Sequence, residues 1–247
     1  MELDGRKKDI IDLLYEKNRV SVAELAKTLY VSEMTIRRDL NQLEKMGMLK
    51  RYRGGAVLAL SEDGMPISRR FFVDESEKLS LSKKAEKFLD NNLTVYIDSS
   101  STCHYIIPFI KKFHNTMIIT NSLNALQISS KLQIPCILIG GEYYEKDMCF
   151  VGAIAEQYAE QFNIDVAFFS SGGFSKDGII SDQDIEQSNI RKIIMKHSEK
   201  NIFIFDKNKL NKKYFYTVCN SSEADEIITW GNPSFCVNLK IYSKMII

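Results

Sequence analysis

The stretch Val31-Ser-Glu-Met-Thr-Ile-Arg-Arg-Asp-Leu-Asn-Gln-Leu-Glu-Lys-Met-Gly-Met-Leu-Lys-Arg-Tyr-Arg-Gly-Gly-Ala56 decides the fold of the first part of this chain. Its hydroxyl residue Ser32 favours a helix start. Ile36, Leu40 and Leu43 follow at helical spacing, which predicts one buried face. The opposite side carries two guanidinium groups near the helix start, and we expect it to contact DNA. Its residues are Ser32, Glu33, Met34, Thr35, Arg37 and Arg38.

Two further helices are expected before this one. The apolar spacing of residues 10–14 predicts a first amphipathic helix. Ser21 and Glu24 have the spacing of a capping box, which predicts a second helix over residues 22–29. A short link then leads to Ser32, so the three helices have the spacing of a helix-turn-helix unit.

A short basic hairpin is expected after the third helix. Gly47 can end that helix in a left-handed cap. Leu49 to Val57, with the pair Gly54-Gly55, has the pattern of a two-stranded wing. Residues 1–57 are therefore predicted to form a winged helix-turn-helix domain. The wing residues expected to contact phosphate are Lys50, Arg51 and Arg53.

The charge distribution supports this interpretation. Residues 1–57 hold 12 Lys and Arg against 9 Asp and Glu, whereas the rest of the chain holds 21 against 23. A locally basic domain is typical of contact with nucleic acid. The alternative is that Arg37 and Arg38 form surface ion pairs on an ordinary helix. The cap, the helix spacing and the basic wing together favour DNA binding.

The remaining residues have the pattern of an α/β domain. Residues 58–74 break the periodicity and are the expected linker to a domain over residues 75–247. Apolar strands alternate there with helices, which predicts a mostly parallel sheet covered on both faces. The expected strands are 94–97, 117–120, 136–139, 166–170, 201–205 and 226–229, and the expected helices are 82–89, 122–131, 154–162 and 184–200.

Small polar residues follow five of these strands. Ligands of an open parallel sheet bind beyond the carboxyl ends of its strands, and free backbone N–H groups there attract anions. With Lys209 nearby, a phosphate is the expected guest. The alternative is that these residues only cap helices and form turns. The segments concerned are 98–102, 120–122, 140–141, 170–173 and 206–209.

Taken together, Ser32-x-x-Thr35-Ile-Arg-Arg-Asp-Leu40, Leu43-Glu44, Gly47 and Arg51-x-Arg53-Gly-Gly-Ala56 resemble the DeoR family of bacterial transcription regulators. The resemblance extends over almost the full chain. In this motif the family usually has His at the position of Arg53. The resemblance implies a DNA-binding regulator whose second domain has a fold similar to ribose-5-phosphate isomerase and whose effector is a phosphorylated sugar.

The resemblance also implies an effector site at the strand ends. This chain departs from the family pattern at Ser100 and Ser170, where the family usually has Gly, and at Ile190, where the family usually has Lys. These departures leave three alternatives: a less anionic effector, a differently shaped one, or a site that has lost its ligand. Arg191 and Lys192 are not expected to replace the Lys, because on a helix they point away from position 190. The expected effector residues are Asp98, Ser100, Ser101, Thr102, Thr120, Asn121, Gly140, Gly141, Gly172, Gly173, Glu186, Asp206 and Lys209.

Two other functions compete with a regulator. In a sugar-phosphate isomerase or deaminase, a carboxylate such as Asp98, Asp182, Asp184 or Glu186 would be the base and Lys209 would polarise a carbonyl. A dinucleotide-binding redox sensor is excluded because the chain has no G-x-G-x-x-G segment. We expect a protein that binds its effector without turnover, so no residue is predicted to be catalytic.

Composition and residue spacing limit the class of protein further. The chain is 45% hydrophobic and 26% charged, as in ordinary globular proteins, and no apolar run is long enough for a membrane span. The five cysteines contain no C-x-x-C pair, and the three histidines have no ligand spacing, so no metal and no cofactor are expected. We therefore expect a cytoplasmic repressor of sugar uptake or catabolism genes. It should bind double-stranded operator DNA as a homodimer or homotetramer.

Overall fold

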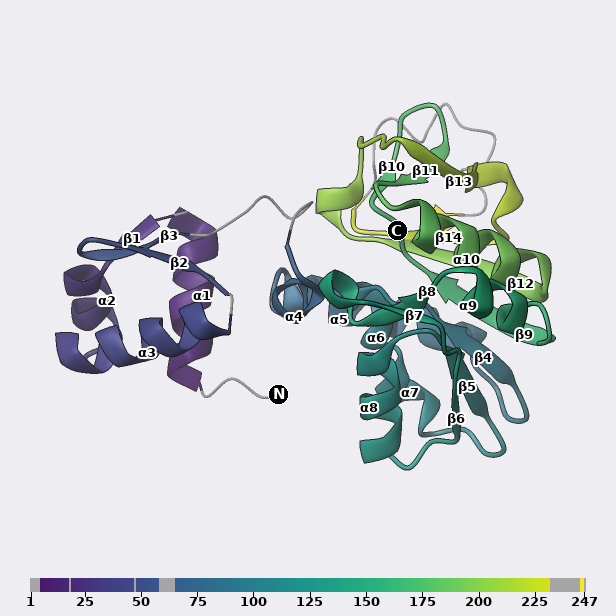
Figure 1. Cartoon of the computed structure of the whole chain (residues 1–247), viewed down its shortest axis with the longest axis horizontal. Helices are drawn as coiled ribbons and strands as arrows, with labels where there is room; N and C mark the ends of the chain where they lie inside the picture. Colours follow the sequence, from purple (N-terminus) through teal and green to yellow (C-terminus); the bar gives the residue numbers. More distant parts are fainter. Residues whose placement is uncertain (1–4, 18, 47, 58–64, 232–244, 247) are drawn as a thin grey trace. The chain divides into compact units, whose positions relative to one another are not determined.

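The computed structural model describes residues 5–17, 19–46, 48–57, 65–231 and 245–246. The chain divides into two compact units, Met1–Glu75 and Ser76–Ile247, which we call the head and the sensor unit (Figure 1). Both domains that the sequence predicts are present. The expected limits of the linker, residues 58–74, remain a prediction, and residues 58–64 lie outside the described part.

The head is a three-helix unit with a small antiparallel sheet. Its elements are α1 (Gly5–Lys17), β1 (Arg19–Ser21), α2 (Val22–Thr28), α3 (Glu33–Lys45), β2 (Lys50–Tyr52) and β3 (Gly55–Val57). The sheet order is β1-β3-β2, so the expected two-stranded wing gains a third strand from the segment before α2. The cap expected at Gly47 lies outside the described residues.

Helix starts in the head follow the predicted capping residues. The Ser21 hydroxyl accepts a hydrogen bond from the Glu24 backbone N–H, and the Ser32 hydroxyl accepts one from the Thr35 backbone N–H. The buried side of α3 includes Ile36, Leu40 and Leu43, which join residues of α1, α2 and β3 in one core. Local capping and apolar spacing therefore account for this part of the fold.

The sensor unit is built around a fully parallel seven-stranded sheet in the order β15-β14-β12-β9-β4-β5-β6. Two short antiparallel sheets, β10-β11-β13 and β7-β8, are added to it. The strands are β4 (Thr94–Ile97), β5 (Met117–Thr120), β6 (Cys136–Leu138), β7 (Glu142–Tyr144), β8 (Cys149–Val151), β9 (Ile164–Phe169), β10 (Gly173–Phe174), β11 (Ile179–Asp182), β12 (Ser198–Phe205), β13 (Tyr216–Asn220), β14 (Glu226–Thr229) and β15 (Met245–Ile246).

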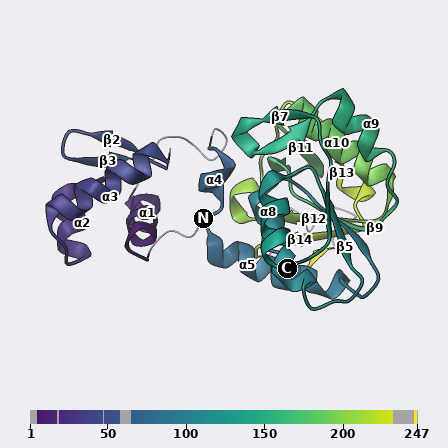
Figure 2. The same ribbon diagram turned by 60° about the horizontal axis from the view of Figure 1, so that its bottom comes forward.

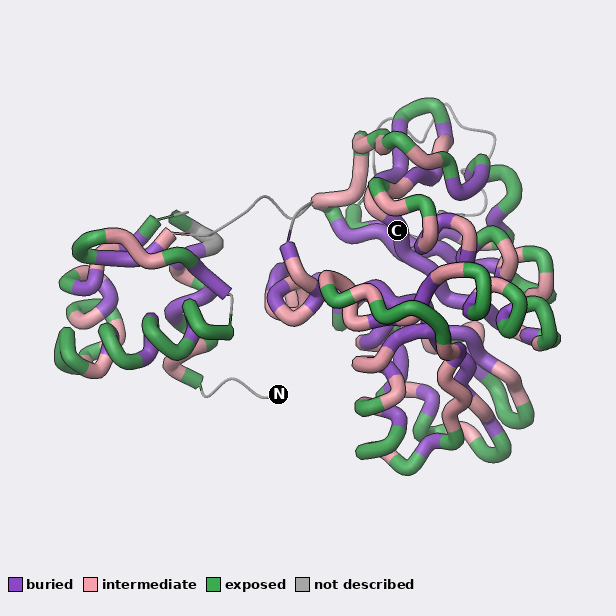
Figure 3. The backbone as a smooth tube through the Cα atoms, in the orientation of Figure 1, coloured by how far each residue is buried: buried purple, intermediate pink, exposed green. Residues whose placement is uncertain are grey.

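Helices cover both faces of the parallel sheet (Figures 1 and 2). One apolar core forms between the sheet and α9 and α10, and a second forms between the opposite face and α5 to α8. The central strands are therefore almost entirely buried, as Figure 3 shows. The helices are α5 (Glu75–Ala85), α6 (Ser101–His104), α7 (Ile107–Ile110), α8 (Leu123–Lys131), α9 (Ala153–Ala159) and α10 (Ile185–Lys196), and the 3-10 turns are η2 (Glu86–Phe88), η3 (Glu145–Asp147), η4 (Lys207–Lys209) and η5 (Ser221–Glu223). The short helix α4 (Ile67–Arg70) precedes them and belongs to the Met1–Glu75 unit.

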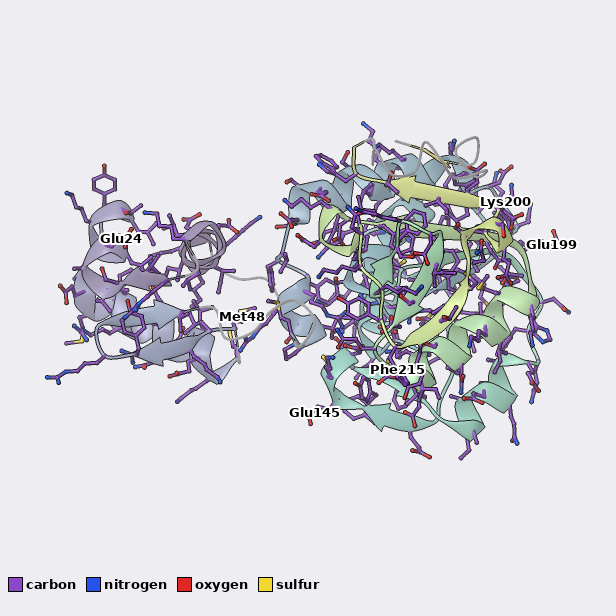
Figure 4. The ribbon with its side chains drawn as sticks, turned by 90° about the horizontal axis from the view of Figure 1, so that it is seen from above. Glu24, Met48, Glu145, Glu199, Lys200 and Phe215 are labelled. Atoms are coloured by element: carbon purple, nitrogen blue, oxygen red, sulfur yellow. The ribbon has the colours of Figure 1, made fainter. Side chains whose placement is uncertain are left out.

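The chain reverses its direction of travel across the sheet beside β4. From β4 it runs outward through β5 to β6, and it then returns to place β9 on the other side of β4. The loops after β4 and β9 therefore leave the sheet in opposite directions. The point between two such strands is where open α/β sheets bind their ligands. Figure 4 shows Glu145, between β7 and β8, on the opposite side of the sensor unit from Glu199 and Lys200 at the amino end of β12.

Three expected helices have other limits in the structure. The helix expected over residues 82–89 is α5, which begins at Glu75 and ends at Ala85, and the helix expected over residues 154–162 ends at Ala159. The third was also predicted too long. The expected helix over residues 184–200 ends at Lys196, and β12 begins at Ser198. The reason is that residues 198–200 extend β12 alongside the start of β9, where Ser198 pairs with Ile164 and Lys200 with Val166. Strand pairing there overrides the helical pattern of the charged residues.

Candidate DNA-binding surface and effector site

The start of α3 presents an exposed polar side. Ser32, Glu33, Met34, Arg37 and Arg38 are exposed, and Thr35 is partly buried. A Glu33 carboxylate oxygen accepts a hydrogen bond from Arg37 at 3.0 Å, with both side chains about half exposed. An exposed pair of this kind is worth only about 0.3–0.5 kcal/mol, so it does not prevent Arg37 from contacting a phosphate or a base.

A partly buried ion pair connects α1 with α3. Arg6 Nε of α1 lies 2.6 Å from Asp39 Oδ2, and the Asp39 side chain is almost completely buried. Asp39 therefore faces the interior, while its neighbours Arg37 and Arg38 face solvent. The apolar pattern of the sequence did not identify this contact. The sequence signal that could have predicted it is Asp39 itself, an acidic residue at a core-facing position of the helix.

The wing is attached to the helices by side-chain contacts. The Tyr52 hydroxyl donates to the Val20 carbonyl oxygen, and the Arg19 guanidinium stacks over the Tyr52 ring at 4.0 Å from its centroid. Arg51 donates from its side chain to the Asn41 side-chain oxygen and from its backbone to Glu44. Lys50 and Arg53 are exposed. Of the three predicted wing contacts, Arg51 is thus held against α3, and the other two face solvent.

In the sensor unit, Asp98 joins the ends of the two strands at which the chain reverses. It follows β4, and its Oδ2 accepts a hydrogen bond from the Ser170 backbone N–H, directly after β9, at 3.2 Å. Asp98 is buried with a relative exposure of 1%. The carboxylate predicted from the sequence therefore lies at the reversal point of the sheet.

Arg191 of α10 connects the buried carboxylate of Asp98 with the partly buried carboxylate of Asp182. Its Nε and Nη2 donate to the two oxygens of Asp98 at 3.2 and 3.3 Å, and its Nη1 donates to Asp182 at 2.8 Å. Burial alone would raise the pKa of Asp182, but the charge of Arg191 and three hydrogen bonds outweigh it and hold that pKa below its usual value. Asp182 is therefore ionised at neutral pH, and the Arg191 guanidinium is the cationic partner of both side chains.

Lys209 and Asp206 form a second polar group beside the first. The Lys209 ammonium donates to the Ser170 hydroxyl at 2.8 Å and to the Thr102 hydroxyl at 3.3 Å. Thr102 donates in turn to Asp206 at 3.2 Å. These residues come from the ends of β4, β9 and β12, so the parallel sheet brings them together as the sequence predicts. Ser170, a departure from the family pattern, supplies the shortest contact of Lys209.

The remaining predicted hydroxyl and amide residues are buried at the same edge. The Asn121 side chain accepts from the Tyr96 hydroxyl at 3.0 Å and donates to the Phe150 carbonyl oxygen. Thr120 donates to the Ile97 carbonyl oxygen, and Ser100 caps α6 by accepting from the Cys103 backbone N–H. Ser101, at the first position of α6, is also buried. These contacts fix the loops, which is the capping role that the alternative interpretation assigned to them.

The expectation about α10 was wrong in one respect. Ile190 belongs to the apolar core, and Arg191, which helical geometry was expected to turn away, reaches the strand ends. Gln187 and Arg191, four residues apart on α10, are both buried and contact residues that follow β4. Gln187 accepts from the Ser99 hydroxyl and donates to Asp147, whereas Glu186 is only partly buried. The site therefore does not lack a cation.

The four predicted glycines have different surroundings. A side-chain carbon at Gly141 would lie 2.6 Å from the Val151 carbonyl oxygen, and one at Gly173 would lie 2.6 Å from the Lys212 carbonyl oxygen. Gly172 faces the Tyr214 ring at 3.0 Å, whereas nothing lies within 4 Å of the corresponding point at Gly140. Only Gly140 therefore leaves open space; the other three glycines permit close packing within the protein.

The arrangement binds polar groups more readily than it transfers protons. Of the carboxylates considered as bases, Asp98 and Asp182 are paired with Arg191, and Asp184 caps α10. Among the described residues, no group of three His, Cys, Asp or Glu side chains could hold a metal ion. In the same residues, no helix is both long and apolar enough to cross a membrane.

A winged helix-turn-helix head on an α/β sensor unit defines a DNA-binding transcriptional regulator. Residues 6–62 match the DeoR-like helix-turn-helix domain, and residues 73–230 match the DeoR C-terminal sensor domain. The chain belongs to the DeoR family. Its partners are therefore operator DNA and a small-molecule effector.

Named relatives cover almost the full chain. The HTH-type transcriptional regulator GolR of Listeria innocua is 29% identical over 97% of this chain and 93% of its own length. The glycerol-3-phosphate regulon repressor of Escherichia coli is 28% identical over 96% and 94%. A D-ribose-5-phosphate isomerase structure matches 55% of this chain and 54% of its own at 18% identity and a TM-score of 0.42. The two relatives are named as regulators and not as enzymes.

Proposed function

We propose that this regulator represses sugar uptake or catabolism genes in the cytoplasm and that its effector is a phosphorylated sugar. The observation that carries the proposal is the buried polar cluster at the reversal point of the parallel sheet. Asp98, Arg191 and Lys209 meet there, beside the helix start at Ser100. Carboxylates accept hydrogen bonds from sugar hydroxyls, while a lysine and free amides attract a phosphate.

Each predicted group has a role in this proposal. Asp98 and Asn121 hold hydroxyl groups of the sugar. Lys209 and the backbone amides of residues 100–102 hold the phosphate, and Gly140 leaves open space after β6. The cations are already paired in the structure, so the ligand must exchange its own oxygens for those of Asp206, Thr102 or Ser170. The name of the glycerol-3-phosphate regulon repressor supports a phosphorylated effector.

We propose that the DNA contacts are made by the exposed side of α3 and by the wing. Arg37 and Arg38 contact bases or phosphates from the major groove, and Lys50 and Arg53 contact phosphates. One small head makes few contacts, so the regulator acts as a homodimer or homotetramer that presents heads to repeated half-sites. The basic charge of the head and the exposure of these side chains support this part of the proposal.

The single tryptophan offers a direct test of the effector site. Trp230 follows β14, and its backbone N–H donates to the carbonyl oxygen of Phe205, the residue before Asp206. Its fluorescence should therefore change when a ligand contacts the 206–209 turn. We would titrate the full chain with glycerol 3-phosphate, ribose 5-phosphate, fructose 1-phosphate and fructose 6-phosphate, and with unphosphorylated fructose as the matched control.

We expect at least one phosphate, but not fructose, to change the fluorescence and to raise the melting temperature. A ligand at 100 times its dissociation constant adds about 2.7 kcal/mol of stability. Lys209→Met should weaken binding at least tenfold, whereas Lys213→Met, which changes an exposed lysine paired with Asp177, should not. If no phosphate has an effect at 10 mM, the proposed effector class is wrong.

A further inference from the structure

The 206–209 turn contacts two different parts of the sensor unit. On one side it carries Asp206 and Lys209, which bind the strand-end residues Thr102 and Ser170. On the other side it contacts the first turn of α5. The Lys207 backbone N–H donates to Glu77 Oε1 at 2.6 Å, and the Lys207 ammonium lies 3.5 Å from Glu77 Oε2.

The α5 side of this contact consists of buried charges. Glu77 and Lys78 have relative exposures of 4% and 2%, although Lys and Glu are seldom buried unless they are paired. Burial alone would raise the pKa of Asp206, but the charges of Lys209 and Lys78 outweigh it and lower that pKa. Two cations therefore act on the charge of Asp206: Lys209 at the effector site and Lys78 on α5.

Such contacts connect the turn with the start of α5. A buried ion that loses its partner is strongly destabilised, so a displacement of the turn must be followed by Glu77 and Lys78 or be opposed by them. The sensor unit begins at Ser76, one residue before Glu77. Glu77 and Lys78 are thus among the first residues of the sensor unit along the chain.

We propose that Glu77 and Lys78 couple effector binding at the 206–209 turn to the segment that leads to the head. A ligand oxygen that draws Lys209 away from Asp206 changes the position of the turn, and Glu77 and Lys78 transmit this change to α5. The inference rests on the proposed effector site. It assigns to two residues of α5 a positioning role that effector binding alone does not require.

The test is hydrogen exchange of the full chain, with and without the sugar phosphate from the panel that changes Trp230 fluorescence most. In the wild type, we expect the ligand to slow exchange in residues 98–104 and 206–210. It should also change the exchange rates of residues 79–84 of α5 at least twofold. In Glu77→Gln, the first response should persist and the response of α5 should be lost.

Matched variants separate coupling from a general loss of structure. Glu86→Gln alters a glutamate just after α5 that pairs with Lys112, away from the turn, and should behave as the wild type. Lys78→Met removes the opposite charge and should lose the α5 response as Glu77→Gln does. Unchanged exchange elsewhere in the sensor unit shows that each variant is folded.

The outcomes distinguish the two proposals. If the strand-end residues respond in the wild type but residues 79–84 do not, the coupling is refuted while the effector site stands. A Glu77→Gln chain that keeps the full α5 response also refutes it. If no part of the sensor unit responds to any phosphate of the panel, the effector site fails and the coupling fails with it.

Discussion

Arg191 determines how the strand-end cluster is held together. Its guanidinium binds both oxygens of Asp98 and one oxygen of Asp182, and it is almost fully buried. Burial alone would lower the pKa of Arg191, but Asp98 and Asp182 raise it, so the group stays charged at every accessible pH. One side chain of α10 thus connects the ends of β4 and β11.

Replacing Arg191 by Met should strongly destabilise the sensor unit. One buried and one partly buried carboxylate would lose their shared partner, which costs about 3–5 kcal/mol. The adjacent Lys192 is exposed, so Lys192→Met should change stability by less than about 0.5 kcal/mol. Urea unfolding followed by the fluorescence of Trp230 measures both variants. Equal stability of the two variants would show that the buried ion pairs contribute nothing.

Tyr30 illustrates strain at a single exposed residue. Its backbone has φ of +54°, and its side chain is 94% exposed in the turn between α2 and α3. Because glycine adopts this conformation without a steric penalty, Tyr30→Gly should stabilise the head by up to about 1 kcal/mol.

Hydrogen exchange of the α3 amides tests the effect of Tyr30→Gly. We expect these amides to exchange up to about fivefold more slowly. Gln133→Gly, also exposed and with φ of +57° but located in the sensor unit, should leave them unchanged. Faster exchange in Tyr30→Gly would mean that the tyrosine ring supports the turn.

The residue-scale contacts could be predicted only where they are local. Ser32 was identified as a cap because its partner, the Thr35 N–H, is three residues away. Arg191 was expected to point away from the site because the face of α10 that meets the strand ends depends on how the helix packs over the sheet. Periodicity gives the angle between Ile190 and Arg191 but not which of them faces the polar cluster.

At the scale of elements, the wing combines two functions. Arg51 binds Asn41 of α3, so it fixes the hairpin to the helix. Lys50 and Arg53 stand in solvent, where they can reach phosphates on either side of a groove. We therefore expect the wing to contribute affinity more than sequence preference.

Lys50→Ala and Arg53→Ala should each weaken binding to every DNA sequence alike. The slope of log K against log salt should become shallower by about 0.9 for each lost phosphate contact. Binding to one selected duplex and one scrambled duplex at several salt concentrations measures this. An altered base preference at an unchanged slope would instead make the residue a base contact.

The strands of the parallel sheet between residues 94 and 229 were predicted from sequence, and those of the two added antiparallel sheets were not. The strands β4, β5 and β14 match their expected limits because each is a continuous apolar run between turns. The β7-β8 hairpin and the β10-β11-β13 sheet were missed. Their strands have two to five residues and depend on contacts between residues distant in the sequence, such as Gln187 with Asp147.

At the scale of the whole molecule, two carboxylates predict how stability depends on pH. The pKa values of Asp182 and Asp206 are lowered in the folded state. Their stabilising contribution is therefore complete above the unfolded value of about 4 and is lost as pH falls through the folded values.

Unfolding by urea at pH 7, 5, 4 and 3 tests this dependence, because Trp230 reports on the sensor unit alone. We expect stability to fall with pH below about 5, and to fall less in Asp182→Asn, which has one titrating group fewer. If the sensor unit becomes more stable between pH 5 and pH 3, the ionised state assigned to these groups is wrong.

The central claim is that one unit binds DNA and the other changes that binding when it holds a sugar phosphate. Coupling between two sites requires that the ligand favour one state of the protein over another. The head and the sensor unit supply the two sites, and the start of α5 supplies the proposed connection. Whether the ligand strengthens or weakens DNA binding follows from which state it favours.

The affinity of the full chain for a duplex selected from random DNA, measured with and without the most effective phosphate of the panel, tests this claim most directly. We expect that phosphate to change the affinity at least tenfold. Arg38→Ala should weaken DNA binding by about 1–3 kcal/mol and leave the Trp230 response intact. Lys209→Met should bind the duplex normally and lose the response to ligand. An affinity that is the same with and without every phosphate of the panel would contradict the account.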